Sequence, residues 1–218
     1  IASNSNEQSA IDLAMAEHAD KIFIILDTTL KSPTPVSLLE KTVYDRSLLN
    51  NVDLVILREN NSTKITGTSR VLQGRKIHLH HHVALNQQSD LERLQRFIAG
   101  KAIGLILCGG GALGTAHLGM LKALQEHGYT FDIIGGTSIG SVIASIYAMG
   151  HAPDDALAYL EEVFIKKKAL GKYTIPIYSF VDHRHVDEVL KHAGANNDIE
   201  DLPINYFATA TNLSSNQL

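Results

Sequence analysis

The sequence predicts an α/β fold in which a mostly parallel central sheet carries helices on both faces. Two observations predict it. Short continuous apolar runs, typical of buried strands, alternate along the chain with longer amphipathic stretches. Glycine-rich segments at 109–111 and 135–136 follow two of these runs, where a strand would turn into a helix. Alternating strands and helices favour a parallel sheet, because the helices supply the crossover connections.

Residues 1–100 are expected to form an α/β region that precedes the rest of the chain and packs on it. The predicted strands are 21–26, 52–57 and 76–80, and the predicted helices are 36–50 and 89–99. Ser89 and Glu92 have the spacing of a capping box, which satisfies the first N–H groups of a helix. Gly100 is expected to end that helix.

Residues 101–218 continue the alternation. Strands are predicted at 102–107, 132–134 and 206–211, and helices after the glycine cluster, after Ser138, from Pro153 and at 186–192. The helix after the glycine cluster is expected to bury one stripe, formed by Ala116, Met120, Leu121 and Leu124. The helix after Ser138 is expected to bury Val142, Ile143, Ile146 and Tyr147.

The composition is that of a folded globular protein with no affinity for nucleic acid. Of the 218 residues, 44% are hydrophobic and 19% are charged, and the net charge is 19 − 23 = −4. The single cysteine, Cys108, excludes a disulfide framework and favours an intracellular location. No apolar run approaches the roughly 20 residues of a membrane span. Because the chain begins at Ile1 instead of Met, it is expected to be a fragment.

Residues 136–140 read Gly-Thr-Ser-Ile-Gly, which is the pattern of a serine nucleophile on a sharp strand-to-helix turn. Gly136 and Gly140 would permit the turn and expose Ser138 at the carboxyl end of the sheet. The positive end of the following helix dipole would there favour developing negative charge. The pattern therefore indicates acyl transfer, since a serine hydroxyl needs such help to attack a carbonyl.

The glycine cluster upstream would supply the second requirement, donors for an oxyanion. Gly109, Gly110 and Gly111 lack side chains, so their backbone N–H groups can approach a ligand closely. A rival interpretation is a dinucleotide site, because Gly109, Gly111 and Gly114 also fit Gly-x-Gly-x-x-Gly. That site expects an acidic residue at the end of the next strand, whereas Asp132 is at the beginning of that strand and glycines follow it.

The histidines suggest two further hypotheses. The run that contains His78, His80, His81 and His82 could bind a metal, but neighbouring strand residues point to opposite faces, so an edge-strand role is favoured. His117 is expected to pack on its helix. The later histidines leave a Ser–His–Asp triad open, although the glycine cluster argues against it. They are His183, His185 and His192.

Two segments carry a resemblance to a known family. Residues 107–119 (LCGGGALGTAHLG) and 135–141 (GGTSIGS) resemble the patatin-like phospholipases, most closely their neuropathy target esterase-like branch. The resemblance extends upstream through Arg75 and His80–His82, and downstream to 199–209. It implies a patatin-like (Rossmann-like) architecture that is incomplete at the C-terminus, with 101–218 as the N-terminal part of the phospholipase domain.

The resemblance also implies a reaction: hydrolysis of phospholipid or lysophospholipid acyl esters by a Ser–Asp dyad. Ser138 would be the nucleophile and Gly109–Gly111 the oxyanion hole, with Gly114, Gly136 and Gly140 supporting the motifs. No metal or organic cofactor is implied. The substrate would come from a membrane surface, which suggests a cytoplasmic or peripheral membrane protein, and cyclic-nucleotide-binding-like domains would precede Ile1.

The sequence departs from the family in two ways. Leu113 occupies a position where the family has Arg or Lys, and it is expected to pack on the helix face. The dyad aspartate normally precedes a glycine, and none here does; those after the serine are Asp154, Asp155, Asp182, Asp187, Asp198 and Asp201. The chain is therefore expected to lack its base and to be nearly inactive. A non-catalytic lipid-binding or regulatory module is the alternative.

Overall fold

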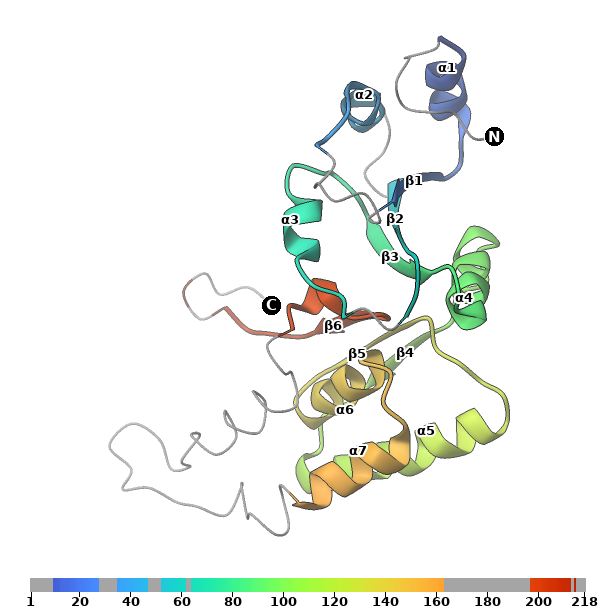
Figure 1. The fold of residues 1–218 in the computed structure, drawn as a ribbon. Helices are drawn as coiled ribbons and strands as arrows, with labels where there is room; N and C mark the ends of the chain where they lie inside the picture. Colours follow the sequence, from blue (N-terminus) through green and yellow to red (C-terminus); the bar gives the residue numbers. More distant parts are fainter. Residues whose placement is uncertain are drawn as a thin grey trace. The chain divides into compact units, whose positions relative to one another are not determined.

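The computed structural model describes residues 10–27, 35–46, 52–61, 64–162, 197–212 and 214. The chain divides into two compact units, Ile1–Ala102 and Ile103–Leu218. Each unit contains a three-stranded parallel sheet with helices packed against it (Figure 1). The predicted α/β class with parallel strands and flanking helices is confirmed. The predicted packing of residues 1–100 on the later part of the chain stays a prediction.

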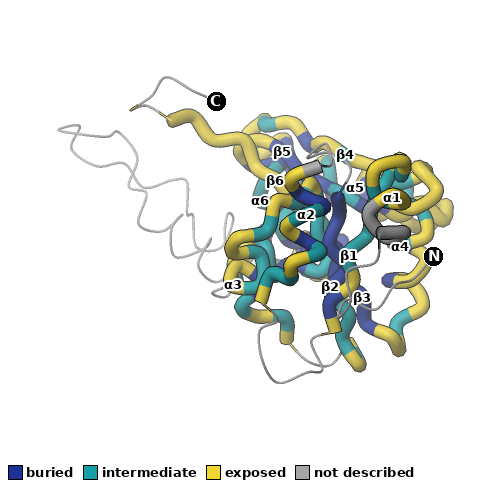
Figure 2. The backbone as a smooth tube through the Cα atoms, turned by 90° about the horizontal axis from the view of Figure 1, so that it is seen from above, coloured by how far each residue is buried: buried dark blue, intermediate teal, exposed yellow. Residues whose placement is uncertain are grey.

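The sheet of the first unit has the order β1-β2-β3, in which each strand lies parallel to the next. The strands are β1 (Ile22–Asp27), β2 (Val52–Arg58) and β3 (Leu79–Ala84), and the helices are α1 (Ala10–His18), α2 (Leu38–Arg46), α3 (Thr68–Leu72) and α4 (Gln88–Ile98). The central strand β2 is the most deeply buried, as Figure 2 shows, and Leu54 is fully inaccessible. Its apolar side chains therefore form the centre of this unit.

Two predictions for the first unit were wrong in detail. The strand predicted at 76–80 begins three residues later, because its register with β2 pairs Leu79 with Asp53. The capping box is absent: α4 begins at Gln88, and Ser89 lies inside its first turn. Gly100 does end the helix, with φ of 65° and its N–H bonded to the carbonyl of Phe97.

The second unit has the strand order β4-β5-β6, again all parallel, so β5 is central. Its strands are β4 (Gly104–Leu107), β5 (Ile133–Gly136) and β6 (Asn205–Ala208). The helices are η2 (Gly111–Thr115, 3₁₀), α5 (Ala116–Glu126), α6 (Ile139–Ala148), α7 (Pro153–Leu160) and η4 (Ile199–Asp201, 3₁₀). Helix α6 follows β5 directly and contacts all three strands, so it covers one face of this sheet.

The core of the second unit lies between α6 and the sheet. Ile143 and Ile146 are buried as predicted, and both belong to the cluster that contains Ile134 of β5. The prediction for α5 was partly wrong. Its buried residues are Leu118 and Leu121, whereas Met120 is 40% exposed.

Glycine 135 on β5 allows an aromatic ring to cross the sheet surface. A Cβ at Gly135 would lie only 2.5 Å from ring carbons of Phe207 on β6, a distance that real Cβ atoms do not reach. The ring of Phe207 therefore occupies the space that any other residue at 135 would fill. The two residues are register partners in the parallel pair β5–β6.

Candidate active site

Ser138 occupies a strained turn between β5 and α6. Its φ of 52° and ψ of −128° make it the one non-glycine residue with positive φ in the described part of the chain. Such a conformation costs on the order of 1–3 kcal/mol and persists where the surrounding structure imposes it. The side chain is exposed, although the residues on either side of the turn, Gly136 and Ile139, are buried. The turn therefore exposes the serine to solvent while Gly136 and Ile139 remain packed in the interior.

The glycines that flank the serine allow the turn to lie against the end of β4. A Cβ at Gly136 would lie 2.5 Å from the carbonyl oxygen of Leu107, and one at Gly140 would lie 2.4 Å from the same oxygen. That oxygen also accepts a hydrogen bond from the N–H of Thr137, at 3.1 Å. Only hydrogen fits at these two positions, because the contacts are with backbone atoms that cannot move aside. The spacing of the motif is thus a consequence of close backbone packing.

The glycine cluster faces Ser138. A Cβ at Gly109 would lie 3.3 Å from Ser138 Cβ, and one at Gly114 would lie 2.2 Å from a side-chain carbon of Ile139, the residue after the serine. Gly111 has φ of 55°, a conformation that favours glycine. The structure therefore brings the two motifs together. Gly109 lies beside Ser138, and Gly114 packs against Ile139, the residue that follows the serine.

The N–H groups of the triglycine segment are available as donors. None of the backbone N–H groups of Gly109, Gly110 and Gly111 donates a hydrogen bond to another residue in the described ranges. Gly110 and Gly111 are exposed, and Gly109 is half-buried. Unpaired N–H groups beside a serine at a helix N-terminus are the elements from which an oxyanion site is built.

Two residues that sequence reasoning missed support the turn. The hydroxyl of Ser141 donates to the carbonyl oxygen of Ser138 at 2.6 Å, and the hydroxyl of Tyr206 on β6 donates to the carbonyl oxygen of Ser141 at 3.1 Å. Burial raises the pKa of Tyr206, so the phenol stays protonated and remains a donor. A tyrosine in a predicted buried strand was the available signal, because its hydroxyl needs a partner.

Two residues around the glycine cluster, Leu113 and His117, differ from expectation. Leu113 does not pack on the helix face, because it is 84% exposed. Cys108, at the end of β4, is a free and exposed cysteine. His117 does not simply pack within α5: its Nε2 lies 3.0 Å from the carbonyl oxygen of Cys108 and 3.7 Å from the Cys108 sulfur. Its ring therefore holds the strand end from which the glycine cluster departs.

No general base for Ser138 is found in the described ranges. The Ser138 hydroxyl forms no hydrogen bond with a described carboxylate or imidazole. Asp154 is instead paired with Lys122, at 2.8 Å, and Asp201 is buried near the start of β6. The histidines of the Ser–His–Asp hypothesis, His183, His185 and His192, lie outside the described residues, as do Asp182 and Asp187.

The aspartate before β5 has a structural role. Asp132 is fully inaccessible, and its carboxylate accepts a hydrogen bond from the N–H of Ile103 at 2.9 Å. This contact joins the beginnings of β4 and β5. The carboxylate therefore lies at the end of the sheet opposite to the glycine cluster, where it cannot hold a ribose bound to that cluster.

Two histidines of β3 contact different polar side chains. His81 Nε2 lies 3.0 Å from the carboxylate of Asp53, which also pairs with Lys21 at 2.8 Å. His82 Nε2 lies 3.4 Å from the hydroxyl of Thr68. Within the described ranges no three His, Cys, Asp or Glu side chains form a group that could hold a metal ion. The strand is at the edge of its sheet as predicted, yet His81 and His82 are both buried.

Comparison with known proteins gives a family match for most of the second unit. Residues 105–212 match the family described as patatin-like phospholipase. An uncharacterized NTE family protein of Mycobacterium tuberculosis is 36% identical over 133 residues, which cover 61% of this chain and 22% of that protein. The family match over 105–212 includes Ser138, the glycine cluster, β5, β6 and all of β4 except Gly104.

Two further relatives are named as lysophospholipases. Lysophospholipase NTE1 of Coccidioides immitis is 36% identical over 135 residues, covering 60% of this chain and 9% of the relative. Lysophospholipase NTE1 of Candida glabrata is 34% identical over 185 residues, covering 80% of this chain and 10% of the relative. The chain thus spans between about a tenth and a fifth of the length of these relatives.

Proposed function

Because this chain carries a patatin-like phospholipase domain related to the NTE family, we propose that Ser138 is the nucleophile of an esterase acting on phospholipid or lysophospholipid acyl esters. The observation that carries this proposal is the position of Ser138. It is held at φ of 52° on an exposed turn, with Gly109 beside it. A strained and exposed serine costs stability, and active sites are where such strain is found.

The reaction follows from the groups around the turn. The Ser138 hydroxyl would attack the ester carbonyl, and the oxygen would become an anion that the N–H groups of Gly109–Gly111 and the N-terminus of α6 stabilise. Collapse of this intermediate releases the alcohol part of the lipid and leaves an acyl-serine. Water then attacks the acyl-serine through the same oxyanion geometry and releases the fatty acid. Loss of one such donor costs about 3 kcal/mol of barrier.

The proposal assigns the proton transfers to an aspartate of an Asp-Gly motif. No aspartate in these 218 residues precedes a glycine, and no described carboxylate bonds Ser138. We therefore expect the 218 residues alone to be inactive or nearly so, and a chain that includes the motif to be active. No cofactor takes part in this scheme, since serine, amides and carboxylate supply every group.

The substrate class is taken from the relatives, which are named as lysophospholipases. Such a substrate would be extracted from a membrane surface, so the protein would act there as a peripheral enzyme inside the cell. The described helices include none that is both long and apolar enough to cross a bilayer.

One observation favours a second candidate, a non-catalytic lipid-binding or regulatory module. Leu113 is 84% exposed at the position where the family carries a cation. An exposed leucine can contact lipid but cannot place an anionic head group. The two candidates differ in whether Ser138 reacts.

Covalent labelling distinguishes them. A chain extended to the Asp-Gly motif is treated with an alkyl fluorophosphonate, and labelled protein is counted by mass spectrometry while hydrolysis of lysophosphatidylcholine is followed. We expect stoichiometric labelling that Ser138→Ala abolishes and that the control Ser145→Ala, on the same helix, leaves unchanged. Absence of labelling and hydrolysis would favour the binding module. Rapid stoichiometric labelling of the 218 residues alone would show that the aspartate is not needed.

A further inference from the structure

An apolar groove lies in the second unit, between the start of α7 and a wall formed by η2 and the first two turns of α5. Its volume is about 390 Å³, which falls within the range of small-molecule sites. Figure 1 shows α7 beside α5, and the two helices contact each other. Leu113 of η2 and Leu157 of α7 both line the groove. The groove is therefore a feature of one unit, made by packed helices.

The groove begins where the glycine cluster ends. Its first lining residue, Ala112, follows Gly111 directly in the sequence. Gly114 of η2 packs so closely on Ile139 that a Cβ would lie 2.2 Å from a side-chain carbon of that residue, and Ile139 follows Ser138. The short helix η2 therefore contacts the serine turn and also forms part of the groove. An ester held at Ser138 would have the groove next to it.

The floor of the groove follows α5. Thr115, Gly119 and Lys122 line it at intervals of four and three residues, which is the spacing of one helix face. With a rise of about 1.5 Å per residue, this stripe runs for roughly 10 Å. Nothing lies within 4 Å of a Cβ built at Gly119, so the middle of the floor carries no side chain and has open space above it. The floor therefore suits an extended chain.

The groove has no net charge and few polar groups. Lys122 of α5 and Asp154 of α7 pair with each other, with the ammonium nitrogen 2.8 Å and 2.9 Å from the two carboxylate oxygens. The Thr115 hydroxyl donates to the carbonyl oxygen of Ala112 at 2.9 Å. The other residues that line the groove, all in the described part of the chain, are alanine, leucine, glycine or proline. An alkyl chain therefore matches this lining better than a charged head group does.

Two exposed leucines make binding of such a chain favourable. Leu113 is 84% exposed and Leu157 is 39% exposed, and they reach the groove from different helices. A single leucine on a surface is common, but two that line one groove form an apolar patch. An alkyl chain between them would remove apolar surface from water on both sides, which is the main source of affinity for an uncharged chain.

We propose that this groove binds the acyl chain of the ester that Ser138 attacks. The inference rests on the esterase function proposed above and adds the part of the substrate that the enzyme selects. Leu113 is then a specificity-determining residue, because it contacts the acyl chain at the position where the family carries a cation. The acyl chain lies along α5, and the head group extends away from the groove into solvent.

The dependence of hydrolysis on chain length tests the proposal. A chain extended to the Asp-Gly motif is assayed with the p-nitrophenyl esters of acetate, hexanoate and decanoate, each below its aggregation concentration. We expect kcat/KM to rise by about twofold to fourfold for each added methylene until the groove is filled. The quantity compared between variants is the ratio of kcat/KM for decanoate to kcat/KM for acetate.

Two variants and one control address the groove directly. Leu113→Ser removes an exposed side chain, so it should leave thermal stability unchanged and lower the ratio by about fivefold. Gly119→Leu fills the open space on the floor and should lower the ratio at least as much. The control is Met120→Ser, on the same helix but outside the groove; it should keep the wild-type ratio. A ratio that both groove variants leave unchanged would overturn the groove while leaving the esterase function intact.

Photo-crosslinking tests the groove without hydrolysis. The Ser138→Ala form of the same extended chain is irradiated with lysophosphatidylcholine that carries a diazirine in its acyl chain, and the labelled peptides are identified by mass spectrometry. We expect labels within 112–122 and 153–157. If these labels form but the wild type does not hydrolyse esters, the esterase function fails and the acyl-binding groove stands. Labels only elsewhere, or labels in the groove from a diazirine on the head group, would overturn the acyl assignment.

Discussion

Gly109 and Ser138 lie so close that a Cβ on the glycine would approach the Cβ of the serine to 3.3 Å. Twenty-eight positions separate them in the sequence, on two different strand ends. The pairing of β4 with β5 aligns Leu107 with Gly136 and so places both strand ends at the same edge of the sheet. The proximity of the two motifs is a direct product of parallel pairing.

The strain at Ser138 predicts a gain in stability when the serine is replaced by glycine. Ser138→Gly should raise the free energy of unfolding by about 1 kcal/mol, because glycine adopts positive φ without a steric penalty. Ser138→Ala keeps the Cβ and should give little gain. Both variants should lose esterase activity. Urea unfolding of the two variants measures the difference, and equal stabilities would show that the turn is not strained.

Gly114→Ala should displace the turn that carries the nucleophile. Its Cβ would lie 2.2 Å from a side-chain carbon of Ile139, so either Ile139 or η2 must move. We expect a loss of about 1–3 kcal/mol, typical of overpacking, with a loss of activity. Gly119→Ala on α5 is the matched control, since nothing lies within 4 Å of its Cβ position. That variant should be slightly more stable, by about 0.5–1 kcal/mol. A harmless Gly114→Ala would contradict the close packing.

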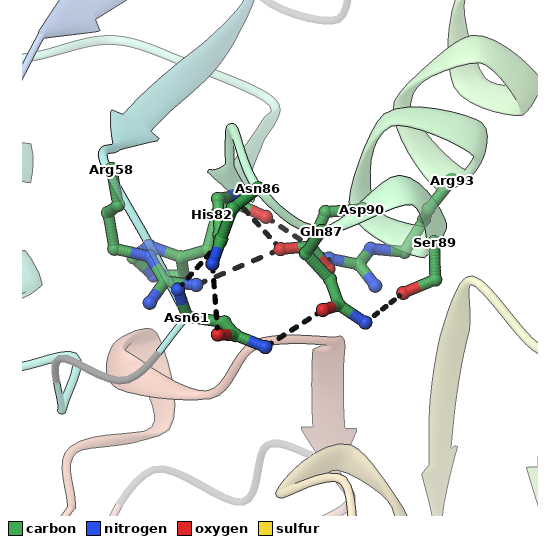
Figure 3. A network of polar contacts seen from close by, with 9 residues as sticks. Arg58, Asn61, His82, Asn86, Gln87, Ser89, Asp90 and Arg93 are labelled. Atoms are coloured by element: carbon green, nitrogen blue, oxygen red, sulfur yellow. Dashed lines mark hydrogen bonds and ion pairs between the residues drawn. The ribbon is translucent and has the colours of Figure 1, made fainter.

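Asp90→Asn should be strongly destabilising. The carboxylate of Asp90 accepts hydrogen bonds from Arg93 and from the N–H of Ala84, and it faces Arg58 (Figure 3). Neutralising it removes the counter-charge of the buried Arg93 guanidinium, at a cost of about 3–5 kcal/mol. Asp45→Asn, on the exposed side of α2, is the control and should change stability by less than about 0.5 kcal/mol. Thermal unfolding of both variants provides the comparison.

The lowered pKa of Asp53 predicts a loss of stability in acid. Burial by itself raises the pKa of this carboxyl, but the hydrogen bonds from His81 and Lys21 outweigh it and hold the pKa below the ordinary value of 3.8. A depressed pKa contributes stability that is complete above the unfolded value and is lost as pH falls through the folded value. We therefore expect unfolding free energy to drop below about pH 4. Asp53→Asn should have a lower free energy of unfolding at neutral pH. Its free energy of unfolding should also depend less on pH in the acid range than that of the wild type.

The sequence predicted those parts of the fold that depend on local pattern. The apolar runs around Leu54 and Ile134 are strands, and the stripe with Ile143 and Ile146 faces the core. The two glycine motifs could be brought together because parallel strands place their carboxyl ends at one edge. Phospholipase activity and the roles of the motif residues remain proposals.

The predictions that were wrong, or could not be made, depend on where a helix begins and on contacts between elements that are distant in the sequence. The capping box at Ser89 did not form because α4 begins at Gln88, so that Ser89 lies inside the first turn and its hydroxyl accepts a hydrogen bond from the Gln87 amide. Met120 fits the helical stripe, but the neighbours of α5 cover a different side. The support of Ser138 by Tyr206 could not be foreseen either, because it depends on β6 pairing with β5 after a long intervening segment.

The ring of Phe207 over Gly135 determines how β6 can attach. If β6 slid along β5 by one residue, every side chain would exchange faces, and Phe207 would lie opposite Ile134 or Gly136 instead of Gly135. In the observed alignment, the absence of a Cβ at Gly135 leaves the space that the Phe207 ring occupies. In that alignment the phenol two strands away from the glycine cluster reaches the first turn of α6. A bulky substitution at position 135 would therefore misplace the serine without touching it.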